Sequence, residues 1–246
     1  MLSITSHNLL QLTRPTPDFG GLVPSLYCSW AVWAEQDVSG NWYLPPDFDR
    51  ASALEFPVHQ PDAEFPRELV QQLHTRAIFV GLAPGESGLR RVAGVDDWLP
   101  FHAPGRSRDD RVAEALRGTP LWGSFMTDLL PLIHRDKSLL LSGWLKDPRN
   151  TAEITENFAA WEWLLQQIGA LTNESNRTPP ILCFGAQTYA YAQLFLTGNK
   201  RLTAREYTVI KLDSYSPANR KINTVSYRDL VIQALEMAAP ELLEEP

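Results

Sequence analysis

The sequence has few cysteines and no long apolar run. Its 246 residues include only two cysteines, Cys28 and Cys183, and neither belongs to a Cys-x-x-Cys pair. A zinc ribbon or a four-cysteine iron–sulfur cluster therefore cannot be built from this chain alone. No run of about 18 apolar residues is present, and residues 1–14 lack the basic and apolar regions of a signal peptide. We expect a cytoplasmic protein that neither spans a membrane nor is secreted, and that needs no metal and no cofactor.

Positive charge is scarce and is concentrated in one segment. The formal net charge is −7, and residues 1–77 hold nine acidic but four basic side chains. Between residues 199 and 221, six basic residues stand against two acidic ones: Lys200, Arg201, Arg205, Lys211, Arg220 and Lys221. Since proteins that bind nucleic acid carry a basic surface, this segment is the candidate for contacts with a phosphate backbone. A solvated charged face without a partner is the alternative.

Apolar runs alternate with segments of helical periodicity over residues 77–240. The runs predict buried strands at residues 77–82, 122–130, 181–185 and 207–212. Helices are predicted at residues 65–74, between Ser107 and Gly118, and at residues 151–171, 187–196 and 227–243. This alternation predicts an α/β fold of three layers, αβα, with a central and mainly parallel sheet of about four strands.

The segment before the first predicted strand has a different composition. It is rich in proline and aromatic residues and has little periodicity. We therefore expect residues 1–76 to form an irregular N-terminal extension that packs on the core, and residues 77–246 to form the α/β domain.

Ligands of open parallel sheets bind beyond the carboxyl ends of the strands, which directs attention to four loops. These loops are residues 81–88, 127–128, 185–187 and 213–217. The first is rich in glycine but contains neither the dinucleotide fingerprint nor the Gly-Lys-Ser/Thr of a P-loop. The chain also lacks a Gly-x-Ser-x-Gly elbow, which disfavours an α/β hydrolase.

Three of these loops, in this order, resemble motifs of the uracil-DNA glycosylase superfamily. Gly81-Leu82-Ala83-Pro84-Gly85 is similar to the Gly-Glu-Ala-Pro-Gly of its thermostable branch. Phe125-Met126-Thr127-Asp128 is similar to the strand end Tyr-Ile-Thr-Asn that carries the base-reading Asn, and Ser214-Tyr215-Ser216-Pro217 to His-Pro-Ser-Pro. Residues 98–102 and 119–128 look like an uncharacterised bacterial subgroup of that superfamily. The resemblance covers about residues 77–240 and implies a monomeric enzyme that cleaves the N-glycosidic bond of a nucleotide flipped out of DNA.

The chain departs from the family at the residues that carry its chemistry. Leu82 stands where the thermostable branch has Glu, and Ala83 where other members have Asp or Asn. Ser214 replaces the His of the last motif, and the four cysteines of the iron–sulfur branches are missing. These departures indicate a reaction other than ordinary uracil excision.

The aspartate at position 128 predicts a different base. A side-chain amide donates to uracil O4 and accepts from N3–H, whereas an ionised carboxylate only accepts. A carboxylate repels O4 but pairs with the exocyclic amine of cytosine, and such a mismatch in a buried site costs on the order of 10⁴ in discrimination. If Asp128 reads the base, the base is cytosine or a modified cytosine. A cell must not excise cytosine from its own genome, so the expected target is hypermodified cytosine in phage DNA, and the expected role is antiviral defence.

The expected site combines catalytic, base-binding and backbone-binding residues. Glu86 would replace the missing carboxylate, His102 would donate to the leaving base or hold a water, and Asp128 would read the base. Phe101 would stack on the flipped base. The other substrate-binding residues implied are Gly81, Ala83, Pro84, Gly85, Ser214 and Tyr215, and the expected contacts with the DNA backbone are Lys200, Arg201, Arg220 and Lys221.

Structural roles are the alternative for these residues. Asp128 is then a cap at a strand end, Glu86 a solvated loop acid, His102 a hydrogen-bonded structural histidine and Phe101 a core residue. The corresponding alternative function is a catalytically inactive protein of the same fold that binds nucleic acid or a nucleotide, because the replaced residues leave no chemistry.

Overall fold

The sheet at the centre of the protein has five strands. The structure, a computed structural model, describes residues 4, 12, 28–32, 35–36, 42–43, 70–83, 109–133, 138–171, 178–198, 207–216 and 219–244. The strand order is β1-β5-β4-β6-β7. The strands are β1 (Cys28–Trp30), β4 (His74–Gly81), β5 (Ser124–Asp128), β6 (Ile181–Phe184) and β7 (Val209–Leu212). Strands β2 (Glu35–Gln36) and β3 (Trp42–Tyr43) form a separate antiparallel pair.

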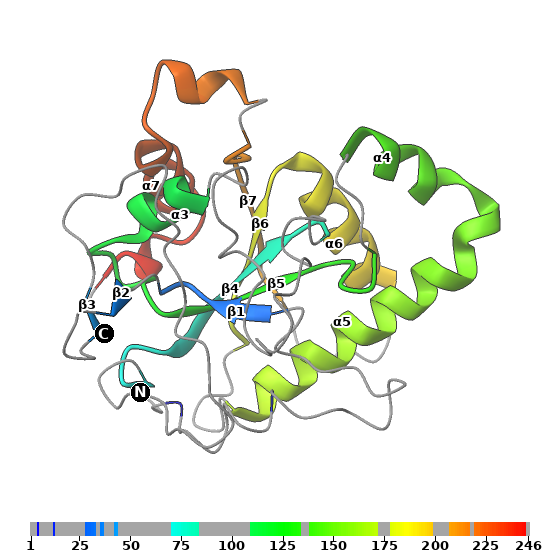
Figure 1. The fold of residues 1–246 in the computed structure, drawn as a ribbon, viewed down its shortest axis with the longest axis horizontal. Coiled ribbons are helices and arrows are strands. Elements are labelled where there is room, and N and C mark those ends of the chain that lie inside the picture. Colours follow the sequence, from blue (N-terminus) through cyan, green and yellow to red (C-terminus); the bar gives the residue numbers. More distant parts are fainter. Residues whose placement is uncertain are drawn as a thin grey trace.

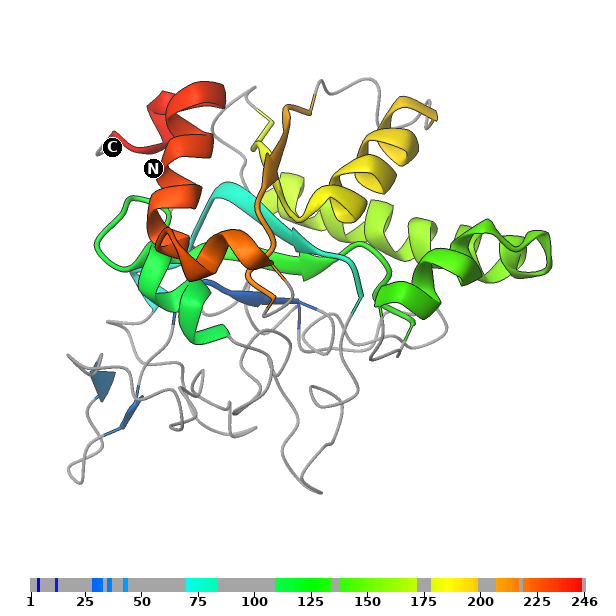
Figure 2. The same cartoon turned by 90° about the horizontal axis from the view of Figure 1, so that it is seen from above.

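Four of the five strands run parallel, so the expected α/β class is confirmed. β4 pairs in parallel with β5 on one side and with β6 on the other, and β6 pairs in parallel with β7. The fifth strand, β1, pairs antiparallel with β5 and comes from the segment expected to be an irregular extension. In both views β1 lies beside β5 (Figure 1, Figure 2).

Helices cover both faces of this sheet. They are α3 (Asp109–Leu116), α4 (Ser138–Lys146), α5 (Thr151–Leu171), α6 (Ala186–Gly198) and α7 (Tyr227–Ala238), with short 3-10 turns η4 (Pro148–Asn150), η5 (Arg220–Asn223) and η6 (Pro240–Leu242). Figure 1 shows α3 and α7 on one side of the sheet and α5 and α6 on the other. Within the described ranges, no helix is both long enough and apolar enough to cross a membrane.

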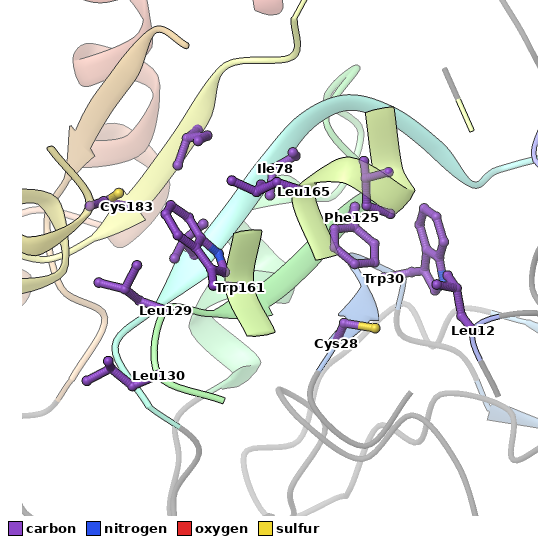
Figure 3. Close-up of a cluster of buried hydrophobic side chains, with 14 of the residues drawn as sticks. Leu12, Cys28, Trp30, Ile78, Phe125, Leu129, Leu130, Trp161, Leu165 and Cys183 are labelled. Carbon is purple, nitrogen blue, oxygen red and sulfur yellow. The ribbon is translucent and has the colours of Figure 1, made fainter. Parts of the chain in front are cut away.

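Side chains of the strands alternate between two hydrophobic cores. Ile78 of β4 and Phe125 of β5 face the core under α5, where they lie with Trp161 and Leu165 (Figure 3). Phe79 of β4 belongs to the opposite core under α3 and α7. Because the side-chain period of a strand is two, both faces of the sheet are buried, which is why its strands read as continuous apolar runs.

The contact that holds β1 in place is aromatic. The Trp30 ring meets Phe125 edge-on, with ring centroids 5.1 Å apart, and Trp30 is fully buried. Figure 3 shows the two rings side by side in the core under α5. A strand of three residues has too little periodicity to be recognised in the sequence, and it is the pairing with β5 together with this packing that makes it part of the sheet.

Several predicted boundaries were wrong for local reasons. The strand predicted at 122–130 begins at Ser124, because Gly123 adopts φ +94° in the turn before it. The helix predicted at 227–243 ends at Ala238, because Pro240 has no N–H to continue it. His74, expected to end a helix, begins β4, while the rest of that predicted helix lies mainly outside the described residues. Helix α4 was not predicted at all.

His74 makes the stability of the amino end of β4 depend on pH. Its Nε2 donates to the Trp122 carbonyl at 2.9 Å, and its Nδ1 accepts from the Arg76 amide at 3.3 Å. Burial, together with the nearby Arg76 charge, lowers the pKa of His74 below 6.5, although its hydrogen bond to Trp122 opposes this shift. The neutral ring therefore fits the folded state and the imidazolium does not.

We expect the free energy of unfolding to fall as the pH drops below about 6.5, where the unfolded state binds a proton more readily than the folded state. Above that pH the contribution of His74 is constant, and below it the slope is at most about 1.4 kcal/mol per pH unit. Urea denaturation of the wild type and His74→Gln between pH 5 and 7.5 measures this, because the carboxylates contribute equally to both proteins. Parallel pH profiles would contradict the expectation.

Candidate functional site at the carboxyl edge of the sheet

The ends of four parallel strands bring the predicted loops to one edge of the sheet. Gly81, the last residue of β4, is in register with Asp128, the last residue of β5. At the other side, Phe184 of β6 is in register with Leu212 of β7, and the Gly185 amide donates to the Leu212 carbonyl at 2.9 Å. Loops that are up to about 130 residues apart in the sequence therefore leave the sheet at the same edge.

A reversal of strand order marks one place on this edge. After β4 the chain places the next strand, β5, on one side and the following strand, β6, on the other. In open α/β sheets such a switch point leaves a crevice beyond the strand ends, since the loops on its two sides lead away from each other. The loop after β4, with Gly81 and Ala83, lies at this point together with the loop after β6.

Asp128 is a buried acid fixed beside the loop after β4. It is 4% exposed. The chain beyond it stays bonded to that loop, because the Leu129 amide donates to the Gly81 carbonyl at 2.9 Å and the Leu130 amide to the Leu82 carbonyl at 3.0 Å. By strand alternation Asp128 shares the face of Met126, under α3 and α7. An acid buried in this way needs hydrogen-bond partners, because a carboxyl group left unpaired out of water is costly.

Tyr215 is held beside this edge by aromatic and backbone contacts. Its ring meets Phe184 edge-on with centroids 5.1 Å apart and lies 6.2 Å from the ring of Tyr227. Its carbonyl accepts from Nη1 of Arg111 at 3.0 Å, which ties α3 to the loop after β7. Tyr215 is therefore positioned by its ring contacts and by the hydrogen bond that its carbonyl accepts.

Ser214 caps the turn that contains it. Its Oγ accepts from the Ser216 amide at 3.3 Å, and its carbonyl accepts from Nδ2 of Asn219 at 2.8 Å. Gly185 approaches it closely at φ +88°, and a Cβ on this glycine would lie 3.4 Å from the Ser214 Cβ. The loops after β6 and β7 are thus in contact, and the serine hydroxyl has a structural task.

Arg220 and Lys221, two of the predicted contacts with the DNA backbone, lie in η5, which follows β7. Nζ of Lys221 lies 3.1 Å from both carboxylate oxygens of Asp213, and the Lys221 side chain is 65% exposed. Asp213 in turn accepts, through its carbonyl, from the hydroxyl of Tyr227 at 2.9 Å. Burial and the Asp213 charge raise the pKa of this tyrosine, so it stays a donor. Arg220 is exposed next to Lys221, and an exposed ion pair of this kind is weak enough to exchange for a phosphate.

The structure therefore brings together some of the predicted site residues. Gly81, Ala83, Asp128, Ser214 and Tyr215 lie at the same edge, with Arg220 and Lys221 in the adjoining segment. The remaining predicted site residues lie outside the described residues: Pro84, Gly85, Glu86, Phe101, His102, Lys200 and Arg201.

Two residues at this edge were missed by sequence reasoning. Arg111 was interpreted only as part of a helix, and the tertiary fold alone brings it to Tyr215. Gln187 follows β6 closely, and its amide nitrogen Nε2 is buried without a hydrogen-bond partner. A buried amide left unpaired costs about 1–3 kcal/mol, so this donor needs an explanation. Its position soon after a predicted strand was the available signal.

In the part of the chain that the structure describes, no three His, Cys, Asp or Glu side chains are grouped as they would be around a metal ion.

Comparisons with known proteins add no relatives. A scan against models of known protein families finds no match, and a search of curated proteins finds none either.

Proposed function

We propose that this protein is a DNA glycosylase with altered base choice, which excises a flipped and modified cytosine from DNA. The observation that carries the proposal is the position of Asp128. This buried carboxylate ends β5 in register with Gly81, where the Gly-Leu-Ala-Pro loop begins. The loop after β7, with Ser214 and Tyr215, leaves the sheet at the same edge. The three segments that resemble the glycosylase motifs therefore lie at one edge of the sheet. A single ligand could contact all three only if they lie together in this way.

The reaction is hydrolysis of the bond between C1′ of the sugar and N1 of the base. The base departs with the bonding electrons and takes up a proton, while water supplies a hydroxyl to C1′. Asp128 accepts a hydrogen bond from the exocyclic amine and so selects the base. Glu86 and His102 are proposed to stabilise the developing positive charge on the sugar and to protonate the leaving base.

The proposed DNA path runs along the loop after β7. Arg220 and Lys221, together with Lys200 and Arg201, contact phosphates, and Tyr215 supports the distorted backbone. We propose that the protein acts as a monomer in the cytoplasm, where two buried cysteines that form no disulfide fit a reducing environment. Foreign DNA that carries hypermodified cytosine is the proposed target, and defence against phage the proposed role.

One observation favours a second candidate, a binding protein without catalysis. Ser214 occupies the position of the family's histidine, and its hydroxyl accepts from the Ser216 amide of its own turn. A hydroxyl that accepts still has its own O–H to donate, but it is a much weaker acid than an imidazolium and so is a poor proton donor to a leaving base.

Incubation with a panel of DNAs separates the two candidates. Oligonucleotides that carry one uracil, cytosine, 5-hydroxymethylcytosine or glucosylated cytosine are treated with the purified protein and then with alkali, and released bases are identified by mass spectrometry. We expect strand cleavage and release of a cytosine-type base. Binding without release supports the second candidate, and neither binding nor release on any DNA rejects both.

A further inference from the structure

The lysine that is proposed to bind a DNA phosphate already has an acidic partner. Asp213 is the first residue after β7, and Lys221 lies in η5, which Figure 1 shows in orange beyond the end of β7. Nζ of Lys221 lies 3.1 Å from both carboxylate oxygens of Asp213. The Lys221 side chain is 65% exposed and the Asp213 side chain 31%. A phosphate that approaches this lysine from solvent therefore meets an ammonium group that is bound to a carboxylate.

The turn between the two residues holds them close together. Nδ2 of Asn219 donates to the carbonyl of Ser214, the neighbour of Asp213, at 2.8 Å. Oδ1 of Asn219 accepts from the Lys221 amide at 3.2 Å. One side chain thus joins the backbone beside the acid to the backbone of the lysine. Because the backbone is held at both places, the ion pair orders only the two side chains when it forms.

The backbone of Asp213 is also tied to the core. Its carbonyl accepts from the Tyr227 hydroxyl at 2.9 Å, and Tyr227 is a buried residue at the start of α7. Asp213 therefore keeps its position when the Lys221 side chain turns towards another anion. Its carboxylate then stays close to that anion and repels it.

We propose that Asp213 is an internal competitor for DNA phosphates, which masks Lys221 and so weakens binding to DNA that lacks the target base. This inference rests on the binding of DNA along the segment after β7, as in the proposed function. Carboxylate and phosphate oxygens are both anionic acceptors for an ammonium group, so only one of them has full use of Lys221 at a time.

The competition raises specificity for the base. Contacts with phosphates form on any DNA, whereas the contact of Asp128 with the base requires the target nucleotide. When the contacts with phosphates are weakened, a larger share of the total affinity depends on the base. The net charge of −7 acts in the same direction, because it repels DNA of every sequence.

The test is the binding of Asp213→Asn to a fluorescein-labelled oligonucleotide of ordinary bases, as single strand and as duplex, measured by anisotropy over a series of NaCl concentrations. We expect the variant to bind about fivefold more tightly than the wild type at low salt, since this is the upper range for an exposed ion pair. The plot of log affinity against log salt should become steeper by about 1, as for one more cation that contacts phosphate. The fold should persist, because Tyr227 donates to the backbone of residue 213 and not to its carboxylate.

Two matched variants control for the change of charge and for the loss of an ion pair. Asp229 is an exposed acid in the first turn of α7, so Asp229→Asn makes the same change of charge close to the segment. Asp147→Asn removes a surface ion pair with Arg149 between α4 and η4. Both should stay within twofold of the wild-type affinity. Lys221→Gln should bind more weakly than the wild type, with a slope shallower by about 1.

Tighter binding of Asp213→Asn with a steeper slope supports the inference, whether or not the wild type releases a base. An affinity of Asp213→Asn no higher than that of Asp229→Asn overturns it and leaves the proposed function intact. Failure of the wild type to bind any DNA, including the oligonucleotides with modified cytosine, overturns the proposed function and the inference together.

Discussion

Replacing Asp128 by Asn is expected to move base preference from cytosine towards uracil. The amide offers a donor to uracil O4 and an acceptor to N3–H, whereas the carboxylate accepts from the cytosine amine. Asp128 is buried at the end of β5, where water cannot compensate for a mismatched pair. We therefore expect the ratio of cleavage rates for the cytosine-type base and uracil to fall by about 10²–10⁴.

Single-turnover release from matched oligonucleotides with one uracil or one modified cytosine measures this ratio. Asp147→Asn is the control, because Asp147 is an acid at the surface between α4 and η4, paired with Arg149 at 2.6 Å. An unchanged ratio in Asp128→Asn, in a protein that still cleaves, would show that Asp128 does not read the base and is only a structural acid at a strand end.

Gly123→Ala is expected to be among the most destabilising single substitutions in this chain. Gly123 has φ +94°, and a Cβ there would lie 1.8 Å from the carbonyl oxygen of Gln72. Its amide donates to the Ala31 carbonyl, and its own carbonyl accepts from the His74 amide, both at 2.9 Å. The clash therefore falls where the starts of β4 and β5 meet the chain after β1. We expect a loss of about 3–5 kcal/mol, because strain in the backbone adds to overpacking.

Two other glycines separate these contributions. Gly118 also has a positive φ, +66°, but a Cβ there would have no atom within 4 Å, so Gly118→Ala should cost only about 1–2 kcal/mol of backbone strain. Gly143 lies inside α4 with open space around its Cβ position, and Gly143→Ala should stabilise by about 0.5–1 kcal/mol. Urea denaturation gives all three values. Equal losses for Gly123→Ala and Gly118→Ala would contradict the proposed clash with Gln72.

The strands and helices that carry strong local signals were predicted closely. The long amphipathic segment that begins at Thr151 forms α5 over the whole predicted range, Thr151–Leu171. The run Ile-Leu-Cys-Phe forms β6, and its end at Gly185 agrees with the positive φ of that glycine. In such segments the period of the apolar residues and the breakers at the ends agree with each other.

Elements without such agreement were missed. Helix α4, Ser138–Lys146, contains three consecutive leucines and Gly143, so its sequence has no clear polar face and one residue unfavourable to helices. β1 is too short for periodicity, and it joins the sheet through its pairing with β5 and the packing of Trp30 against Phe125. Both elements exist because tertiary contacts outweigh weak local preferences.

The sequence by itself determined the α/β class, the four parallel strands and the positions of the loops that follow them, because each of these depends on local periodicity and on residues that end an element. Only the tertiary structure decided the strand order, and with it that Gly81 of β4 lies opposite Asp128 of the neighbouring β5 and that the loops after β6 and β7 touch. It also decided that Arg111 holds Tyr215 and that the Gln187 amide is buried without a partner. These features depend on residues far apart in the chain. Their pairing is set by how the two cores pack on the sheet, and no local sequence pattern predicts that pairing.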